Sequence, residues 1–549
     1  MPCRVQEKGL LSDADRLHLK QSGIDLPLGA IENSFSEQYI LYKGFTLARE
    51  YLWVSYALAD AEGGGLAPSA LIARLRAILP ESEFLSIPLE SMERQDGLLL
   101  ANGRQAITGL AAALRGFRER HVIAPFWQDV YNWILEQPVL LPTFSLVCQG
   151  LFAQASEDCL PKELALRLYT QHRKLRGSVT RFEGFQACPF RHFAKYGLRL
   201  REREEYRFDA PDLGVLLHAT LADFGRQLQK EKRRWRDINR EECHTLCTQI
   251  VTALAPRLQN EILLSTAQAK NQLLRITKAA ENSIQRLIAF DAVSDFQPMA
   301  FECSFSSAPS AVMPPLLFAM ENGYQLEVSG QIDRIDLYNT HFLIIDYKTG
   351  QAAINLLEVY YGLRLQLLTY LLVARNLLMQ QEGEAPLPAG MLYCFLKNPI
   401  LSANHRLSEG EARQLLKKKL QMPGWVLADP AVIREIDHSI SFLKLSISAK
   451  TGNIMNTKTN RACMKTPQDF AVLLDYISWI LADTGKKILD GEIAAQPYRI
   501  GEEKACTYCA FQVLCGFDLM VPGYGYRSLV NHEDAELMDT MELKGKGAI

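Results

Sequence analysis

The sequence has almost no net charge: 60 Lys and Arg stand against 62 Asp and Glu, which leaves −2 over 549 residues. A chain this balanced creates no overall positive field that would attract nucleic acid non-specifically. Any surface for DNA must therefore be a local basic patch. With 48% hydrophobic and 22% charged residues, the composition is that of a globular protein long enough for two or three domains.

Long apolar runs are also missing. No uncharged stretch reaches the length that a membrane-spanning helix needs, and the first residues, MPCRVQEKGLLSDADRL, lack the apolar core of a signal peptide. We therefore expect a cytoplasmic protein without a membrane partner. In that setting the 12 cysteines are expected to be reduced thiols or metal ligands and not a disulfide framework.

A phosphate-binding loop of the form G-x(4)-G-K-[ST] occurs nowhere in the chain. The nearest candidate, Gly485-Lys486-Lys487, lacks the upstream glycine. Without that loop no row of backbone amides is available to cradle nucleotide phosphates. The chain is therefore not expected to be an ATPase by itself.

The stretch Gly330–Gly350 is the most informative part of what is present. It predicts strands at Leu326–Leu337 and His341–Thr349 joined by a turn. The period of two places Asp346 and Lys348 on one face of the second strand, with Asp333 across the hairpin. Two carboxylates that share a divalent cation, beside a lysine, suit metal-assisted phosphodiester hydrolysis. The alternative is a strand-edge salt bridge between Asp346 and Lys348.

The flanking segments predict further elements of an α/β fold. Gln366 and Tyr370 lie on one face of a helix expected at Leu356–Leu378. Buried polar groups at these positions need a partner, which could be the metal site or a DNA phosphate, or a structural hydrogen bond within the protein. Further expected elements are helices Glu37–Glu50, Pro68–Leu79, Ala106–Arg120, Pro125–Glu136 and Lys162–His172, strands Tyr51–Ala57 and Met391–Leu396, and a loop at Met379–Ala389. From Val530 the chain is polar and is expected to be loose.

The order Asp-x(12)-Asp-x-Lys, then Gln366 and Tyr370, resembles the RecB-like branch of the PD-(D/E)XK nucleases from Ser178 to about Gly523. The resemblance implies a Mg²⁺ (or Mn²⁺) site. In it, Asp333, Asp346 and His218 of the G-x(3)-H pattern would be ligands, with the carbonyl of Tyr347 as a further one. Lys348 and Gln366 would position water and phosphate. Glu302 matches an acidic position of the family, although a surface ion pair would also explain it. A lone histidine on an apolar helix is otherwise usually a core residue.

A cysteine cluster, Cys506-x(2)-Cys509-x(5)-Cys515, predicts metal ligation and needs a fourth ligand. Cys188, followed by Pro189, is a candidate. One distant cysteine before such a triplet resembles the AddB-type nuclease subunits, in which four thiolates bind a [4Fe–4S] cluster. Tetrahedral Zn²⁺ is the alternative from spacing alone. Cys243-x(3)-Cys247 is expected to pack in a core.

Two other segments are candidates for nucleotide or DNA contact. Residues 41–72, LYKGFTLAREYLWVSYALADAEGGGLAPSALI, resemble the last motif of the second RecA-like domain of UvrD-type helicases, but Leu47 occupies the position of the expected arginine. Lys230–Arg240, KEKRRWRDINR, offers a DNA-backbone patch around Trp235, although its interspersed acids favour a solvated helix face.

As a whole the chain from about Gly9 resembles the C-terminal half of the B subunits of AddAB-type helicase–nucleases. The expected fold is α/β: a PD-(D/E)XK core, a mixed sheet flanked by helices, with a four-cysteine iron–sulfur staple. The expected domains are an inactive RecA-like helicase remnant (1–90), a helical connecting region (91–176), the nuclease (177–525) and a tail (526–549). The resemblance implies an exonuclease that resects double-strand DNA ends together with an AddA-like helicase partner. The alternatives are an idle DNA-binding scaffold and a stand-alone iron–sulfur exonuclease acting on single strands.

Overall fold

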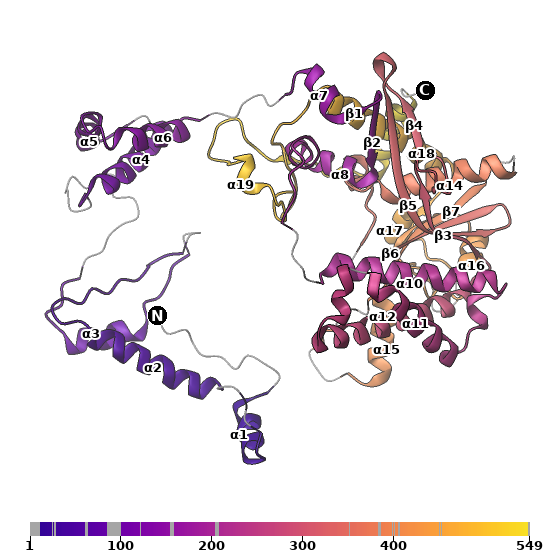
Figure 1. The fold of residues 1–549 in the computed structure, drawn as a ribbon, viewed down its shortest axis with the longest axis horizontal. Coiled ribbons are helices and arrows are strands. Elements are labelled where there is room, and N and C mark those ends of the chain that lie inside the picture. Colours follow the sequence, from indigo (N-terminus) through magenta and orange to yellow (C-terminus); the bar gives the residue numbers. More distant parts are fainter. Residues whose placement is uncertain are drawn as a thin grey trace. The chain divides into compact units, whose positions relative to one another are not determined.

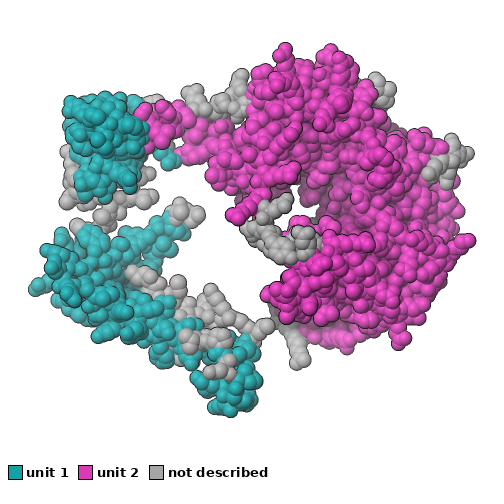
Figure 2. Space-filling view, viewed as in Figure 1, with its two compact units in different colours: residues 1–144 teal, residues 145–549 magenta. Residues whose placement is uncertain are grey.

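The computed structural model describes residues 11–24, 26, 29–60, 64–84, 100–120, 122–153, 159–203, 208–257, 259–350, 352–382, 386–397, 399, 401–403, 407–448, 451 and 453–546 (Figure 1). The chain divides into two compact units, residues 1–144 and 145–549 (Figure 2). The boundary falls inside the helical connecting region that the sequence suggests for 91–176. Each unit is described by itself.

The first unit is helical where it is described. Its helices are α1 (Asp13–Gln21), α2 (Ala30–Thr46), α3 (Ala70–Ile78), α4 (Gly103–Arg120) and α5 (Pro125–Leu135), with α6 (Leu141–Leu151) crossing the boundary. A small core forms between α4 and α5, where Leu110, Trp127 and Ile134 are buried. By contrast, α1 and α3 bury no side chain.

The strand expected at Tyr51–Ala57 is wrong, because these residues carry no regular structure. Tyr51 is 91% exposed and Trp53 is 76% exposed. Alternating aromatic residues report only a propensity for a half-buried sheet surface, and the described part of this unit contains no neighbouring strand with which they could pair. The helices expected on either side are confirmed, with shifted ends.

The second unit is built on a mixed sheet in the order β1-β2-β5-β6-β7-β8-β9, with β3 and β4 also paired to β5. Its strands are β1 (Thr170–Gln171), β2 (Lys174–Ser178), β3 (Gln297–Phe305), β4 (Leu316–Ala319), β5 (Gln325–Tyr338), β6 (His341–Lys348), β7 (Leu387–Phe395), β8 (Gly424–Leu427) and β9 (Met464–Lys465). The pairs β2–β5, β6–β7 and β8–β9 are parallel, and the others are antiparallel. The expected mixed sheet and the predicted β5–β6 hairpin are confirmed.

The long strand β5 joins two parts of this sheet. Its first residues pair with β2 and β4, and its later residues pair with β3 and β6. Gly330 lies at the change of partners. A Cβ atom there would stand 2.7 Å from the ring of Phe305, so glycine allows the close approach of β3.

Helices cover both faces of the sheet (Figure 1). They are α7 (Lys162–Tyr169), α8 (Val179–Ala187), α9 (Pro189–His192), the π-helix η2 (Phe193–Gly197), α10 (Ala210–Lys230), η3 (Trp235–Asp237), α11 (Arg240–Leu254), η4 (Ala255–Arg257), η5 (Gln259–Leu264), α12 (Ala267–Asp291), η6 (Glu321–Gly323), α13 (Leu356–Tyr360), α14 (Gln366–Glu382), α15 (Glu409–Lys419), α16 (Pro430–Ile436), α17 (Lys458–Cys463), α18 (Pro467–Leu489), α19 (Gln512–Cys515) and α20 (Asp534–Lys546). The group α10–α12 meets β3, whereas α14 packs between β6, β7 and α18. Buried apolar side chains of both groups and of the sheet form one continuous core.

Three expectations about this unit are wrong. The helix predicted at Leu356–Leu378 is broken into α13 and α14 around Gly362, which has a φ of +74°. The loop expected at Met379–Ala389 is shorter than predicted, because α14 continues to Glu382 and β7 already begins at Leu387. The chain after Val530 is not loose throughout: α20 buries Leu537 and Met541, four positions apart on one face, against α18.

A small second sheet of β10 (Tyr498–Ile500), β11 (Glu503–Lys504) and β12 (Arg527–Ser528) lies near the C-terminal cysteines. Of the helices described, none combines the length and the apolar character that crossing a bilayer would require.

Candidate metal and catalytic centre

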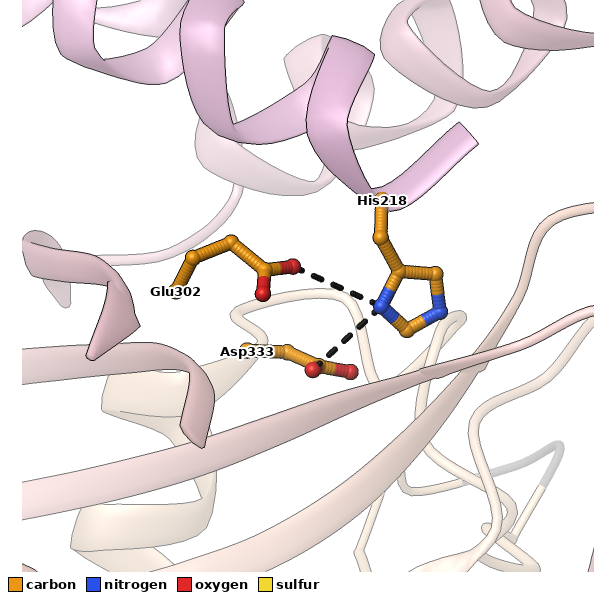
Figure 3. A group of neighbouring side chains, drawn as sticks. All are labelled: His218, Glu302 and Asp333. Atoms are coloured by element: carbon orange, nitrogen blue, oxygen red, sulfur yellow. Dashed lines mark ion pairs between the residues drawn. The ribbon is translucent and has the colours of Figure 1, made fainter. Parts of the chain in front are cut away.

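Three potential metal ligands from separate elements converge in the second unit (Figure 3). They are His218 on α10, Glu302 on β3 and Asp333 on β5, and one ligand atom from each lies within 4.8 Å of the other two. The Nδ1 atom of His218 is 3.4 Å from Oε1 of Glu302 and 3.3 Å from Oδ1 of Asp333. The sequence separation of these residues means that only the packing of α10 on the sheet brings them together.

The electrostatics of this group fit a cation. Burial opposes protonation of His218, but the adjacent carboxylates of Asp333 and Glu302 outweigh it and raise the pKa of the imidazole to about 10. The imidazolium thus occupies the place where two carboxylates need a positive charge. Carboxylate oxygens with one imidazole suit a divalent cation whose remaining positions can hold water or phosphate. The residues present therefore fit the Mg²⁺ or Mn²⁺ that the sequence suggests.

Glu302 reaches this group through an unusual backbone. Its φ of +47° lies in the left-handed region, which a non-glycine residue adopts only at a cost of about 1 kcal/mol or more. Its Oε2 accepts a hydrogen bond from Gln331, while the buried Oε1 lies at ion-pair distance from His218 but accepts no hydrogen bond within the described part of the chain. A buried carboxylate oxygen that accepts no hydrogen bond keeps its lone pairs for a cation.

Asp333 and Asp346 face each other across the β5–β6 hairpin. Arg334 pairs with Ile345, so the next pair in this register joins the two aspartates. Oδ2 of Asp333 accepts the backbone N–H of Tyr347 at 2.7 Å, which fixes its carboxylate. Burial and then the charge of Asp333 raise the pKa of Asp346 to about 7. Two buried carboxylates this close are costly without a cation between them.

Lys348 connects Asp346 to α14. Its Nζ lies 2.7 Å from Oδ2 of Asp346 and donates to Oε1 of Gln366 at 3.0 Å. The contact with Asp346 has the distance of an ion pair without the geometry of a hydrogen bond, so that oxygen keeps its capacity to accept. Gln366 in turn donates from Nε2 to the hydroxyl of Tyr370 at 2.9 Å. The predicted residues therefore form one connected line of polar groups.

Glu183 on α8 belongs to this site, and sequence reasoning missed it. Its Oε1 accepts the backbone N–H groups of Leu365 and Gln366 at 2.7 and 3.2 Å. The first N–H groups of a helix have no partner within it, so Glu183 satisfies the start of α14. It thereby fixes the position of Gln366. Burial raises the pKa of Glu183, and those backbone donors partly offset the effect.

This arrangement predicts that Glu183→Ala lowers the free energy of unfolding by about 1–3 kcal/mol, because two N–H groups lose their acceptor. Cleavage should fall by roughly tenfold, since Gln366 and Lys348 would no longer be held together. Glu183→Gln keeps an acceptor oxygen and should recover most of both losses. Urea unfolding and initial cleavage rates of the two variants test this, and an alanine variant equal to the parent in both would refute the positioning role.

The four predicted cluster cysteines approach one another at one end of this unit. Cys188 lies between α8 and α9, and its thiol is near those of Cys506 and Cys509, as the thiol of Cys506 is near those of Cys509 and Cys515. Burial raises the pKa of Cys188, and the N–H groups of Arg191 and Phe190 partly oppose this. Cys243 and Cys247 are fully buried on α11, in agreement with the packing role expected for them.

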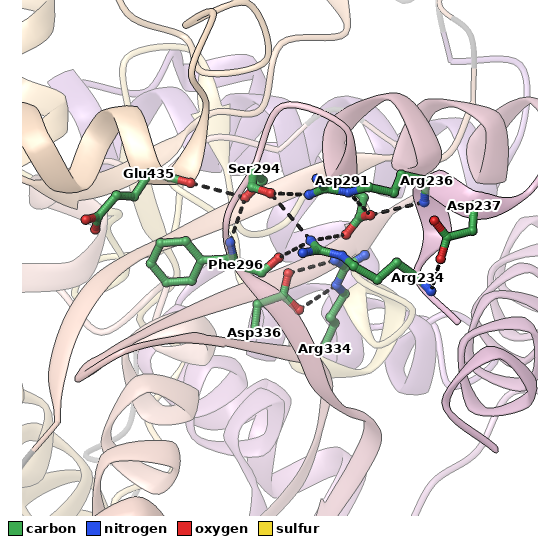
Figure 4. Close-up of polar contacts among 9 residues, drawn as sticks. All are labelled: Arg234, Arg236, Asp237, Asp291, Ser294, Phe296, Arg334, Asp336 and Glu435. Atoms are coloured by element: carbon green, nitrogen blue, oxygen red, sulfur yellow. Dashed lines mark hydrogen bonds and ion pairs between the residues drawn. The ribbon is translucent and has the colours of Figure 1, made fainter. Parts of the chain in front are cut away.

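The DNA patch predicted at Lys230–Arg240 is not supported, because three of its arginines pair with acidic side chains of the protein; Figure 4 shows two of them, Arg234 and Arg236. Arg234 and Arg236 both bind the carboxylate of Asp291, at 2.9 and 3.0 Å. Arg233 pairs with Glu242 and Glu231. Trp235 is 2% exposed, with the guanidinium of Arg334 above its ring. The segment pins η3 to the end of α12 and is structural.

Both the nuclease-like segment and the helices before it are similar in sequence to known protein families. Residues 176–516 match the PD-(D/E)XK nuclease superfamily, and residues 93–150 match the fifth domain of the ATP-dependent helicase/deoxyribonuclease AddB. The chain is 36% identical over 546 residues to the B subunit of the ATP-dependent helicase/deoxyribonuclease from Desulforamulus reducens and 32% identical over 555 residues to that from Bacillus subtilis. These alignments cover 98% and 100% of this chain, but 46% and 47% of the two relatives. The chain thus spans about half the length of the curated relatives it matches.

Proposed function

The chain belongs to the PD-(D/E)XK nuclease superfamily, and from this premise we propose that it hydrolyses DNA phosphodiester bonds as the nuclease subunit of a helicase–nuclease complex. The observation that carries the proposal is the convergence of His218, Glu302 and Asp333 beside the line Asp346–Lys348–Gln366. A structural ion pair would not need three ligands around one point.

In the proposed mechanism Asp333, Asp346 and His218 would hold Mg²⁺ (or Mn²⁺), His218 after releasing its proton to solvent, with Glu302 and the carbonyl of Tyr347 as further ligands. The bound cation would supply Lewis acidity to the phosphate and to the attacking water. Lys348 lies beside Asp346, and its Nζ would stabilise charge that develops on the phosphate. Gln366 keeps that ammonium group directed and, with Tyr370 behind it, excludes bulk water from one side.

For the cysteines we propose a [4Fe–4S] cluster on Cys188, Cys506, Cys509 and Cys515. Support for this cluster over tetrahedral Zn²⁺ comes from the resemblance of the cysteine pattern to that of AddB-type nuclease subunits.

The proposed biological role is exonucleolytic resection of double-strand DNA ends in the cytoplasm, together with an AddA-like helicase subunit in a heterodimer. Support comes from the relatives, whose names combine a helicase and a deoxyribonuclease. One assay separates the alternatives: the purified chain is mixed with end-labelled DNA and Mg²⁺ without ATP, with and without the partner. Cleavage that needs the partner supports the subunit, cleavage of single strands alone supports a stand-alone exonuclease, and none in either case supports an idle scaffold.

We further predict that the isolated chain has no DNA-stimulated ATPase activity. The chain contains no phosphate-binding loop, and Leu47, 68% exposed at the end of α2, stands where the helicase motif has arginine. Phosphate release from ATP should stay at background with saturating single-stranded DNA. Turnover that co-purifies with the chain through two different columns would contradict this.

A further inference from the structure

The second unit contains a basic and aromatic pocket away from the candidate catalytic centre. Its cavity of about 820 Å³ is lined by α7, β2, α8, the π-helix η2 with the residues after it, and the segment Cys506–Cys515. Eight of its lining side chains are Arg or Lys, and one, Glu202, is acidic. In a chain with a net charge of −2, this concentration of positive charge is local.

Most of these cations are not neutralised by the protein. Lys174 and Arg176 share Glu327, but Arg167, Arg191, Lys195, Arg199 and Arg201 have no acidic partner in the part of the chain that is described. Arg181 is held in place by His192 at 3.0 Å and lies 4.6 Å above the ring of Tyr196. Unpaired cations around a rigid guanidinium are suited to a chain of phosphates.

Aromatic rings are interleaved with this charge. Tyr196 and Phe511 line the pocket, and Tyr508 stands at its edge with 94% of its surface exposed. An exposed ring beside a row of cations offers a stacking platform for a base, while the cations track the backbone. In a duplex the faces of the bases are already covered by their neighbours, so only a single strand can use such rings.

We propose that this pocket binds a single strand of DNA and delivers it to the catalytic centre, an inference that rests on the proposed nuclease function. Strand β5 extends from beside the pocket to the catalytic centre. Arg176 on β2 pairs with Glu327 on β5, and Asp333 follows six positions later, about 20 Å along the strand. A strand that kept the stacked rise of about 3.4 Å per nucleotide would span this distance with roughly six nucleotides, and a more extended strand would need fewer.

The test is binding of fluorescein-labelled dT20, measured by anisotropy without divalent cations, so that no cleavage occurs. The triple variant Lys195→Gln, Arg199→Gln, Arg201→Gln should raise Kd at least tenfold at 50 mM salt. The slope of log K against log salt should also become shallower by about 2, as expected for three lost phosphate contacts. Tyr508→Ala should raise Kd by roughly tenfold with the slope unchanged. The variant Lys417→Gln, Lys418→Gln, Lys419→Gln on α15 removes the same charge elsewhere and should bind like the parent.

Hydrolysis of bis(4-nitrophenyl) phosphate with Mg²⁺ or Mn²⁺ separates this proposal from the nuclease assignment, because so small a diester needs only the catalytic centre. The pocket variant should hydrolyse it at the parent's rate while losing cleavage of dT20. A triple variant that binds dT20 with the parent's affinity and salt slope overturns the pocket. Equal losses for dT20 and for a 20-base-pair duplex overturn its assignment to single strands. A parent that binds dT20 through the pocket but hydrolyses neither substrate overturns the nuclease proposal alone.

Discussion

Asp346→Ala should lower the rate of Mg²⁺-dependent DNA cleavage by on the order of a thousandfold or more, the size expected when a principal ligand of a catalytic cation is lost. The fold should tolerate the change. Asp346 is 1% exposed, and its burial beside Asp333 disfavours its charged form, so removing the carboxylate relieves a cost in the metal-free protein. Lys348 loses its ion pair but keeps Gln366 and is partly solvated.

The measurement is the initial rate of release from end-labelled DNA, with the thermal midpoint and dT20 binding of the same preparation. Binding should stay or become tighter, because a negative charge leaves the neighbourhood of the phosphate. Asp223→Ala is the matched control: it removes a carboxylate from the helix that carries His218, but Asp223 pairs with Arg226 outside the site. Near-normal cleavage by pure Asp346→Ala would show that this hairpin is not the active site.

The β5–β6 hairpin could be predicted from the sequence because neighbouring residues alone determine its strands and its turn. The apolar run within His341–Lys348 and the short turn around Asn339, which has a φ of +49°, define two strands and their register. That register is sufficient to place Asp333 opposite Asp346. The position of His218 and Glu302 beside them came from a resemblance and not from a pattern. The left-handed φ of Glu302 that turns it toward the group has no local signal.

The parts that sequence reasoning missed depend on contacts between distant segments. The run Leu356–Leu378 is apolar enough for one helix, but Gly362 has a φ of +74° and lies against α8, where a Cβ atom would stand 2.7 Å from Gln186. Glu183 of α8 then caps the new helix start at Gln366. Likewise, the charges of Arg234 and Arg236 look free in the sequence, since Asp291, which neutralises them, lies at the far end of α12.

Cys188→Ser should destabilise the second unit far more than an ordinary substitution of cysteine. Cys188 stands near the start of the matched segment 176–516, and the other three cysteines stand near its end. A cluster on all four would close a loop that contains strands β3 to β9 of the sheet. By analogy with covalent cross-links, for which a loop of about 100 residues contributes about 4–5 kcal/mol, we expect a loss of several kcal/mol and a fall in Tm of roughly 5–10 °C.

Serine is a poor ligand for iron, so the variant should lose its visible absorption and iron content. The segment Cys506–Cys515 should then become sensitive to protease, because its only helix, α19, is four residues long and buries no side chain. Cys247→Ser is the control: Cys247 is buried on α11, where its thiol donates to the carbonyl of Thr277 at 3.7 Å. A serine hydroxyl can make the same contact, so iron content should be unchanged and Tm should fall only slightly.

The location of the cysteines also predicts how loss of the cluster would lower the rate of DNA cleavage. Asp333, Asp346 and Lys348 lie apart from the four cysteines, but α8 runs from the sheet to Cys188 and carries Glu183 on the way. If the cluster anchors the end of α8, its loss should loosen the start of α14, and cleavage should fall although every catalytic side chain is intact. Hydrolysis of bis(4-nitrophenyl) phosphate should fall in parallel with Tm in Cys188→Ser and stay at the parent's rate in Cys247→Ser. A Cys188→Ser protein that keeps its full iron content and the parent's Tm would place the fourth ligand elsewhere in the chain.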